Sequence, residues 1–105
     1  MSPRRGEVWL WDCGMAKKVR PVLILSVPFD DEDRALVSFV MHTTSLRESK
    51  WEVPVTVSFL RAGAFLTQSV ETFPVATGIR RLGVLTPEQF ERVETAVFRW
   101  LGRSC

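Results

Sequence analysis

The stretch KKVRPVLILSV, residues 17–27, places a cluster of positive charge directly before an apolar segment. Residues 22–25 are all apolar, which is typical of a β-strand covered on both faces. Pro21 disfavours helical geometry at the residue before it, so Arg20 is expected in extended backbone where the strand begins. Such a strand end can hold a functional cation rigidly, and it can equally carry an ordinary solvated charge.

Further short segments on both sides of this strand predict a mainly β domain. In GEVWLWD (6–12) and WEVPVTVSF (51–59), two kinds of side chain alternate residue by residue, as expected for strands. ALVSFVMHT (35–43) is rich in β-forming residues. Pro54 has no backbone N–H, which favours a sheet edge or a bulge for the segment 51–59. AFLTQSVETF (64–73) follows after the turn residues RAG.

The C-terminal segment is the one helix that the sequence predicts. Thr86 is a suitable N-cap, Pro87 fits the first helical position, and Gln89 lies where a capping box requires it. Gly102 is expected to end the helix. An apolar stripe at helical spacing should pack on the sheet rather than on a partner protein; it consists of Phe90, Val93, Val97, Trp100 and Leu101.

Composition indicates one globular domain spanning residues 1–105. Of the 105 residues, 46% are hydrophobic and 25% are charged, and the net charge is +2. This charge is compatible with a polyanionic ligand but does not by itself indicate nucleic-acid binding. The sequence has no signal-peptide pattern and no run of the ~18 apolar residues that a membrane span needs. We therefore expect a soluble, cytoplasmic protein.

The residues available for chemistry exclude several mechanisms. His42 is the single histidine, so one chain cannot assemble a histidine pair for acid–base cleavage of RNA. The acidic run DDED (30–33) could be a cation site, but a solvated turn is favoured because no companion ligands accompany it. Cys13 and Cys105 show no metal-ligand or disulfide spacing. We expect neither a metal nor a cofactor.

The stretch MHTTS (41–45) remains as a candidate site. It places His42 beside three hydroxyl groups where a strand passes into a loop, and the hydroxyls belong to Thr43, Thr44 and Ser45. Hydroxyl donors, an imidazole and a nearby guanidinium suit a phosphodiester ligand. A Ser/Thr turn at a strand end explains the same residues, and composition alone favours that interpretation.

Taken in order, RRGEVWLWDCG, VRPVLILS, the strand ending in HTTS, WEVPV, LTQ and LTPEQFERVETAVFRWLG resemble the MazF/PemK toxins of bacterial toxin–antitoxin systems. The resemblance covers nearly the whole chain. It implies an SH3-like barrel of strongly twisted antiparallel strands with a C-terminal α-helix, and a homodimer inhibited by an antitoxin with a flexible acidic tail. It also implies a metal-independent endoribonuclease selective for RNA sequence. Arg20 matches the family's catalytic arginine and Thr43 its catalytic threonine.

Several positions depart from the family pattern. The segment CGMAKK after the first strand is short and basic, where many members carry a longer loop over the RNA. Gln68 matches a family glutamine, but Thr67 and Phe65 stand where much of the family has an acidic residue and an arginine. His42 has no counterpart in the pattern, and strand alternation predicts that it points away from Thr43. A structural and a catalytic role are both open for it.

The mechanism expected from this reasoning is attack of a ribose 2′-OH on the adjacent phosphorus. Arg20 would stabilise the phosphorane charge and Thr43 would position the phosphate. Lys17 and Lys18 would attract the RNA backbone. The remaining substrate-binding residues are expected to be Thr44, Ser45 and Gln68, and His42 is the candidate general base because its ordinary pKa is near neutral.

Two other functions fit the same fold. A related barrel, the CcdB family, binds DNA gyrase without performing chemistry, and a third reading is a catalytically inactive RNA-binding barrel. The Arg-Pro pair and the Thr-Thr-Ser stretch favour RNA cleavage.

Overall fold

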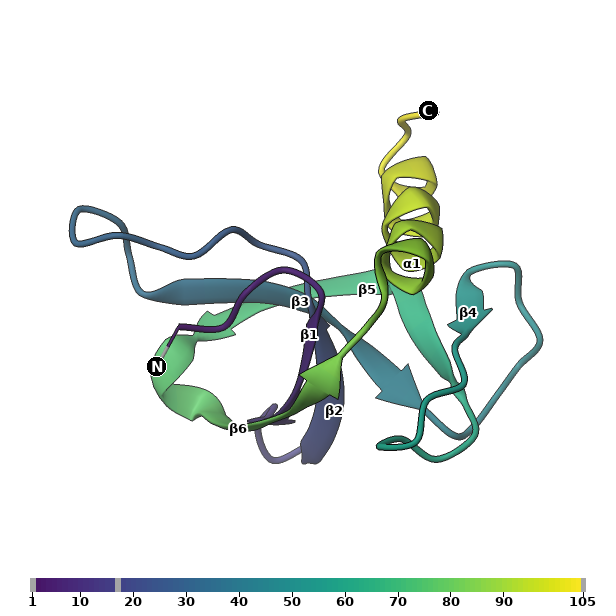
Figure 1. The fold of residues 1–105 in the computed structure, drawn as a ribbon, viewed down its shortest axis with the longest axis horizontal. Helices are drawn as coiled ribbons and strands as arrows, with labels where there is room; N and C mark the ends of the chain where they lie inside the picture. The colour runs from purple at the N-terminus through teal and green to yellow at the C-terminus, as the bar shows by residue number, and fades with distance from the viewer. Residues whose placement is uncertain (1, 17, 105) are drawn as a thin grey trace.

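The computed structural model describes residues 2–16 and 18–104, and its regular structure is a set of β-strands with one C-terminal helix (Figure 1). No helix in this described part is long and apolar enough to cross a membrane. The elements are β1 (Glu7–Asp12), β2 (Val19–Ile24), β3 (Leu36–Thr43), β4 (Glu52–Pro54), β5 (Ala64–Pro74), the 3-10 turn η1 (Val75–Thr77), β6 (Gly78–Val84) and α1 (Pro87–Trp100).

The strands form one twisted antiparallel sheet with the order β4-β5-β3-β2-β1-β6. Figure 1 shows α1 standing over β5, and contacts with β5 and β4 anchor the helix there. The predicted fold class, mainly β with antiparallel strands and a C-terminal helix, is confirmed.

Alternate residues of β2 enter two different apolar clusters, as expected for a strand buried on both faces. Leu23 packs with Val8 in the cluster that α1 covers. Val22 and Ile24 pack on the opposite face in a cluster that contains Trp11. All of these side chains are fully buried, so β2 is held firmly and the backbone at its N-terminal end is well fixed.

Helix α1 begins as predicted. Thr86 Oγ1 accepts a hydrogen bond from Gln89 N, and Thr86 N donates to Gln89 Oε1, which completes the capping box. The prediction for the apolar stripe was wrong at its C-terminal end. Trp100 is 43% exposed and Leu101 63% exposed, and Trp100 packs edge-to-face with Trp51, with ring centroids 5.4 Å apart.

Two strands differ from the sequence-based expectation. The segment 51–59 forms only the three-residue strand β4, which ends at Pro54 because proline cannot donate to a ladder. Its edge position was predicted correctly. Strand β6, at the opposite edge, was not predicted, since Arg80 and Arg81 interrupt any alternation of apolar residues in its sequence. Arg81 instead pairs with Glu7 of β1 at 3.2 Å.

Candidate nucleic-acid interface

The register between β2 and β3 brings Arg20 close to Thr43. Val22 lies opposite Met41, so the same antiparallel register continued by two residues places Arg20 level with Thr43. Both residues line one hollow of about 220 Å³, which we call the central hollow. Its other lining residues are Met41, His42, Leu66, Ser69 and Glu71.

The hydroxyl of Thr43 is held by its own loop. Thr43 Oγ1 accepts a hydrogen bond of 3.0 Å from Ser45 N, so its proton remains available for donation to another acceptor. The approach of Gly63 fixes the backbone here, because a Cβ on Gly63 would lie 2.1 Å from the Thr43 carbonyl oxygen. Only glycine permits this contact. The result is a hydroxyl donor positioned before any ligand binds.

The irregularity beside His42 and Thr43 lies in β5. From the pair Val40–Val70 to the pair His42–Phe65 the register advances by two residues along β3 and by five along β5, so the extra residues belong to β5. His42 and Thr43 both line the central hollow. That their side chains point to opposite sides of β3 stays a prediction.

The imidazole of His42 is only 3% exposed and lies edge-on to Phe65, with ring centroids 5.2 Å apart. Its Nε2 atom is buried, and no described residue forms a hydrogen bond with it. Burial lowers the pKa of His42 below its ordinary value of 6.5. The ring is therefore neutral at pH 7. The unfolded chain binds this proton more readily, so stability decreases as the pH falls below 6.5.

Two further hollows adjoin the central one. The first, about 470 Å³, also contains Arg20 and His42 in its lining. We call it the wide hollow, and its other lining residues are Leu10, Val19, Pro21, Thr44, Phe59, Leu60 and Arg61. The second, about 130 Å³, shares Leu66 and Ser69 with the central hollow. We call it the polar hollow, and its other residues are Arg47, Ser49, Trp51, Glu52 and Gln68.

The remaining residues predicted from the sequence are spread along this row of hollows. Thr44 lies in the wide hollow and Gln68 in the polar one. Ser45 contributes its backbone N–H to Thr43. Lys18 is exposed in the β1–β2 turn, where its φ of 59° is left-handed, and it lines none of the three hollows. Lys17 falls outside the described residues.

Sequence reasoning missed Glu71, Ser69, Phe59 and Arg61. Glu71 is opposite Phe39 in the β3–β5 pairing and brings a carboxylate into the central hollow. The signal that could have found Glu71 is its place on the same strand as Gln68, but the extra residues in β5 hide the register of that strand from the sequence. Phe59 belongs to the segment 51–59, which was expected to be a strand, and Arg61 belongs to the turn after it.

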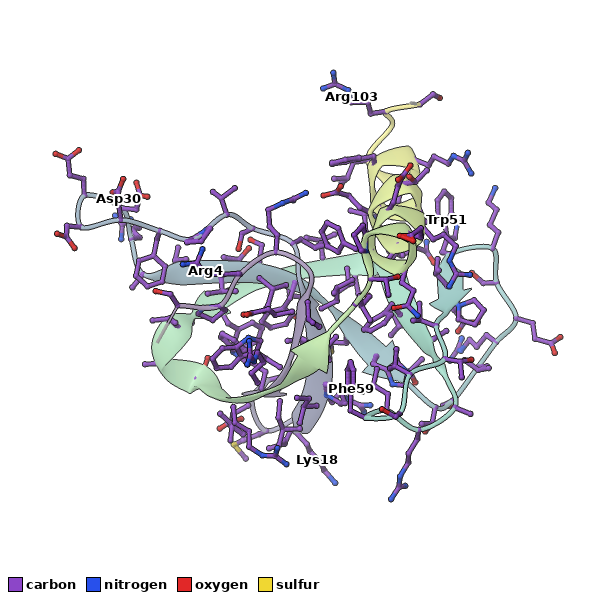
Figure 2. All side chains as sticks on the ribbon, viewed as in Figure 1. Arg4, Lys18, Asp30, Trp51, Phe59 and Arg103 are labelled. Atoms are coloured by element: carbon purple, nitrogen blue, oxygen red, sulfur yellow. The ribbon has the colours of Figure 1, made fainter. Side chains whose placement is uncertain are left out.

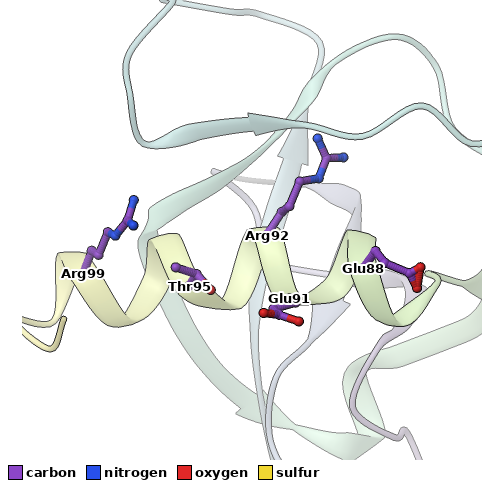
Figure 3. Close-up of a pocket in the computed structure, with 5 residues that line it drawn as sticks. All are labelled: Glu88, Glu91, Arg92, Thr95 and Arg99. Carbon is purple, nitrogen blue, oxygen red and sulfur yellow. The ribbon is translucent and has the colours of Figure 1, made fainter. Parts of the chain in front are cut away.

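Two other features carry charge but lie apart from these hollows. Figure 2 shows Asp30 at the tip of a projecting loop, where Asp30 Oδ1 and Asp33 Oδ2 accept hydrogen bonds from backbone N–H groups of the same turn. Among the described residues, no three His, Cys, Asp or Glu side chains gather as a metal site. Figure 3 shows a shallow hollow along α1 with mixed charges, as on a solvated helix face; it is lined by Glu88, Glu91, Arg92, Thr95 and Arg99.

Comparison with known proteins gives a consistent result. A family model described as PemK-like, MazF-like toxin of type II toxin–antitoxin system matches residues 4–101. The chain is 28% identical to an endoribonuclease solved in complex with its cognate antitoxin from a mycobacterial species, with a TM-score of 0.83 and 98% of each chain covered. No curated protein matches.

Two further solved structures share the fold. The Mycobacterium tuberculosis toxin MazF-mt6 is 25% identical, with a TM-score of 0.76 over 94% of this chain and 99% of that one. A MazE–MazF complex from Deinococcus radiodurans has a TM-score of 0.79 at 20% identity, with 99% of each chain covered.

Proposed function

This chain belongs to the PemK-like, MazF-like toxins of type II toxin–antitoxin systems, and from that membership we propose that it is an endoribonuclease that cleaves single-stranded messenger RNA in the central hollow. The observation that carries this proposal is the presence of Arg20 and Thr43 in the lining of one hollow. A guanidinium and a free hydroxyl proton together suit a phosphodiester, since both donate to phosphate oxygens. Cleavage of messenger RNA would arrest translation and growth.

The reaction follows from these donors. The ribose 2′-oxygen attacks the adjacent phosphorus and loses its proton, and the bond from phosphorus to the 5′-oxygen breaks. The products are a 2′,3′-cyclic phosphate and a 5′-OH. Arg20 stabilises the negative charge that builds up on the phosphorane oxygens, while Thr43 donates a hydrogen bond that orients the phosphate. Arg20 is also our candidate for protonating the leaving oxygen. No step requires a metal.

Cleavage should therefore persist in EDTA. We expect the purified chain to cut a long single-stranded RNA at a limited set of sites in the presence of the chelator, leaving 2′,3′-cyclic phosphate and 5′-OH ends. End mapping checks this, because metal-dependent phosphodiester hydrolysis typically leaves different ends. Intact RNA would contradict the proposal, and binding without cleavage would indicate an inactive RNA-binding barrel.

Two groups in the central hollow can accept the 2′-OH proton, namely His42 and Glu71. We assign the role to His42, because its lowered pKa keeps the imidazole neutral and able to accept a proton at pH 7. Its Nε2 is buried in the free protein, so this role requires that RNA binding exposes that atom.

The cleavage rate should then rise with pH through a midpoint below 6.5 and stay level above it. This limb should vanish in His42→Ala and persist in Glu71→Gln, as measured by initial rates at a series of pH values. Melting curves of both variants control for folding, since His42 is buried. A limb that vanishes in Glu71→Gln instead would reassign the base to the carboxylate.

We further propose that the protein is a cytoplasmic homodimer that binds a cognate antitoxin. The mycobacterial relative was solved with such a partner. An acidic, flexible antitoxin tail would lie across Arg20 and the basic β1–β2 turn and compete with RNA for the same positive charge. Light scattering at micromolar concentration should give twice the chain mass, and a monomer mass would contradict the dimer.

A further inference from the structure

The wide hollow has the most positive lining of the three hollows. The described residues that line it include Arg20 and Arg61 but no aspartate or glutamate. The central hollow contains Glu71, and in the polar hollow Glu52 lies beside Arg47. A cleft lined by charges of one sign focuses the electric field. Of the three hollows, the wide one therefore favours an anion most.

The backbone that leads to Arg61 is anchored by packing. Phe59 and Leu60 pack against the apolar cluster that α1 covers, and a Cβ on Gly83 would overlap the ring of Phe59. Leu60 N donates a hydrogen bond of 3.3 Å to Val57 O within the same turn. Arg61 itself is exposed. An exposed side chain on an anchored backbone loses less entropy on binding a ligand than one on a mobile loop.

Thr44 adds a hydroxyl group to the same lining. It directly follows Thr43 and is exposed, and a hydroxyl can donate a hydrogen bond to a phosphate oxygen as a guanidinium does. The wide hollow measures about 470 Å³, compared with about 220 Å³ for the central hollow. This volume lies in the range of pockets that bind small molecules, so the wide hollow has room for a phosphate together with its sugar.

The wide hollow continues directly from the central one, because Arg20 and His42 line both. An RNA strand whose scissile phosphate lies between Arg20 and Thr43 carries its next phosphate one nucleotide away. That phosphate is attracted to the second guanidinium in the wide hollow, while the carboxylates of the other two hollows repel it.

We propose that the wide hollow is a second phosphate site, which binds the backbone phosphate next to the cleaved one through the guanidinium of Arg61 and the hydroxyl of Thr44. This inference rests on the proposed ribonuclease function. It identifies Arg61 and Thr44 as residues that hold the RNA backbone on one side of the cut, whatever the base, and that take no part in breaking the bond.

The first test is the salt dependence of binding to a single-stranded RNA that cannot be cut, because a 2′-deoxynucleotide replaces the one that carries the attacking hydroxyl. Arg61→Ala should raise Kd several-fold and lower the slope of log Kd against log salt concentration by ~0.7, as expected when one phosphate contact to a single strand is lost. Arg61→Lys keeps the charge and should keep the slope. Fluorescence anisotropy measures both quantities. Arg34→Ala, an exposed arginine outside the three hollows, is the matched control and should bind like the wild type.

The second test locates the phosphate. In the same RNA, an uncharged methylphosphonate replaces in turn the phosphate on each side of the mapped cut, and a 2′-deoxynucleotide before the neutral linkage keeps it intact. One of these two replacements should raise the Kd of the wild type and of Arg34→Ala several-fold, and it should have no further effect on Arg61→Ala. Thermal melting of each variant controls for folding.

An unchanged Kd and salt slope in Arg61→Ala would overturn the proposal. It would also be overturned if the losses from Arg61→Ala and from the neutral linkage multiplied fully at both positions, because Arg61 would then act on neither phosphate. The salt slope is measured on RNA that cannot be cut. These outcomes are therefore distinct from failure of the ribonuclease function, in which the wild type leaves ordinary RNA intact.

Discussion

Replacing Arg20 by alanine should lower the rate of RNA cleavage by ~10²-fold or more while the protein stays folded. The loss follows from removing a fixed cation at the point where the phosphorane charge develops, an effect comparable to deleting one oxyanion donor. Arg20 is exposed at the N-terminal end of β2, ahead of the buried Val22 and Leu23, so its removal leaves the core intact. Initial rates on a short RNA containing one cleavage site measure the effect.

Arg20→Lys separates charge from geometry. Lysine keeps the positive charge but loses the planar fork that binds two phosphate oxygens at once, so it should restore only part of the rate. Arg34→Ala, which removes an exposed arginine outside the three hollows, should cleave like the wild type. A folded Arg20→Ala protein with wild-type activity would exclude the central hollow as the active site.

The order and type of most elements could be predicted because local sequence determines them. The apolar run after Pro21 defines β2, and Thr86 with Gln89 defines the start of α1. The predictions failed where contacts between residues far apart in the sequence determine the structure. Trp100 has helical spacing but stays 43% exposed, and β6 becomes a strand through its backbone pairing with β1.

The candidate site was predictable in part for a related reason. Arg20 and Thr43 lie at strand ends that the sequence marks clearly, so their residue types drew attention to them. The residues that face His42 from β5 depend on the irregularity in that strand, and the inclusion of Glu71 depends on which β5 residue faces the hollow. Both are properties of strand register across the sheet, which short-range patterns do not encode.

Thr43→Val is expected to lower cleavage by ~10-fold or more, because it removes the hydroxyl that donates to the phosphate. The same change leaves Ser45 N without its acceptor at 3.0 Å, which should reduce stability by about 1 kcal/mol. Thr43→Ser retains the hydroxyl and is the matched control. It should recover most of the activity, and thermal melting shows how much of each loss is structural.

Combining Thr43→Val with Arg20→Ala tests whether the two residues hold one phosphate. Groups that act on the same transition state are not independent, so removing the second after the first should cost less than removing it from the wild type. We expect the rate of the double variant to exceed the value calculated by multiplying the two separate losses. Losses that multiply fully would indicate that Arg20 and Thr43 contribute independently, which would contradict their joint action on one phosphate.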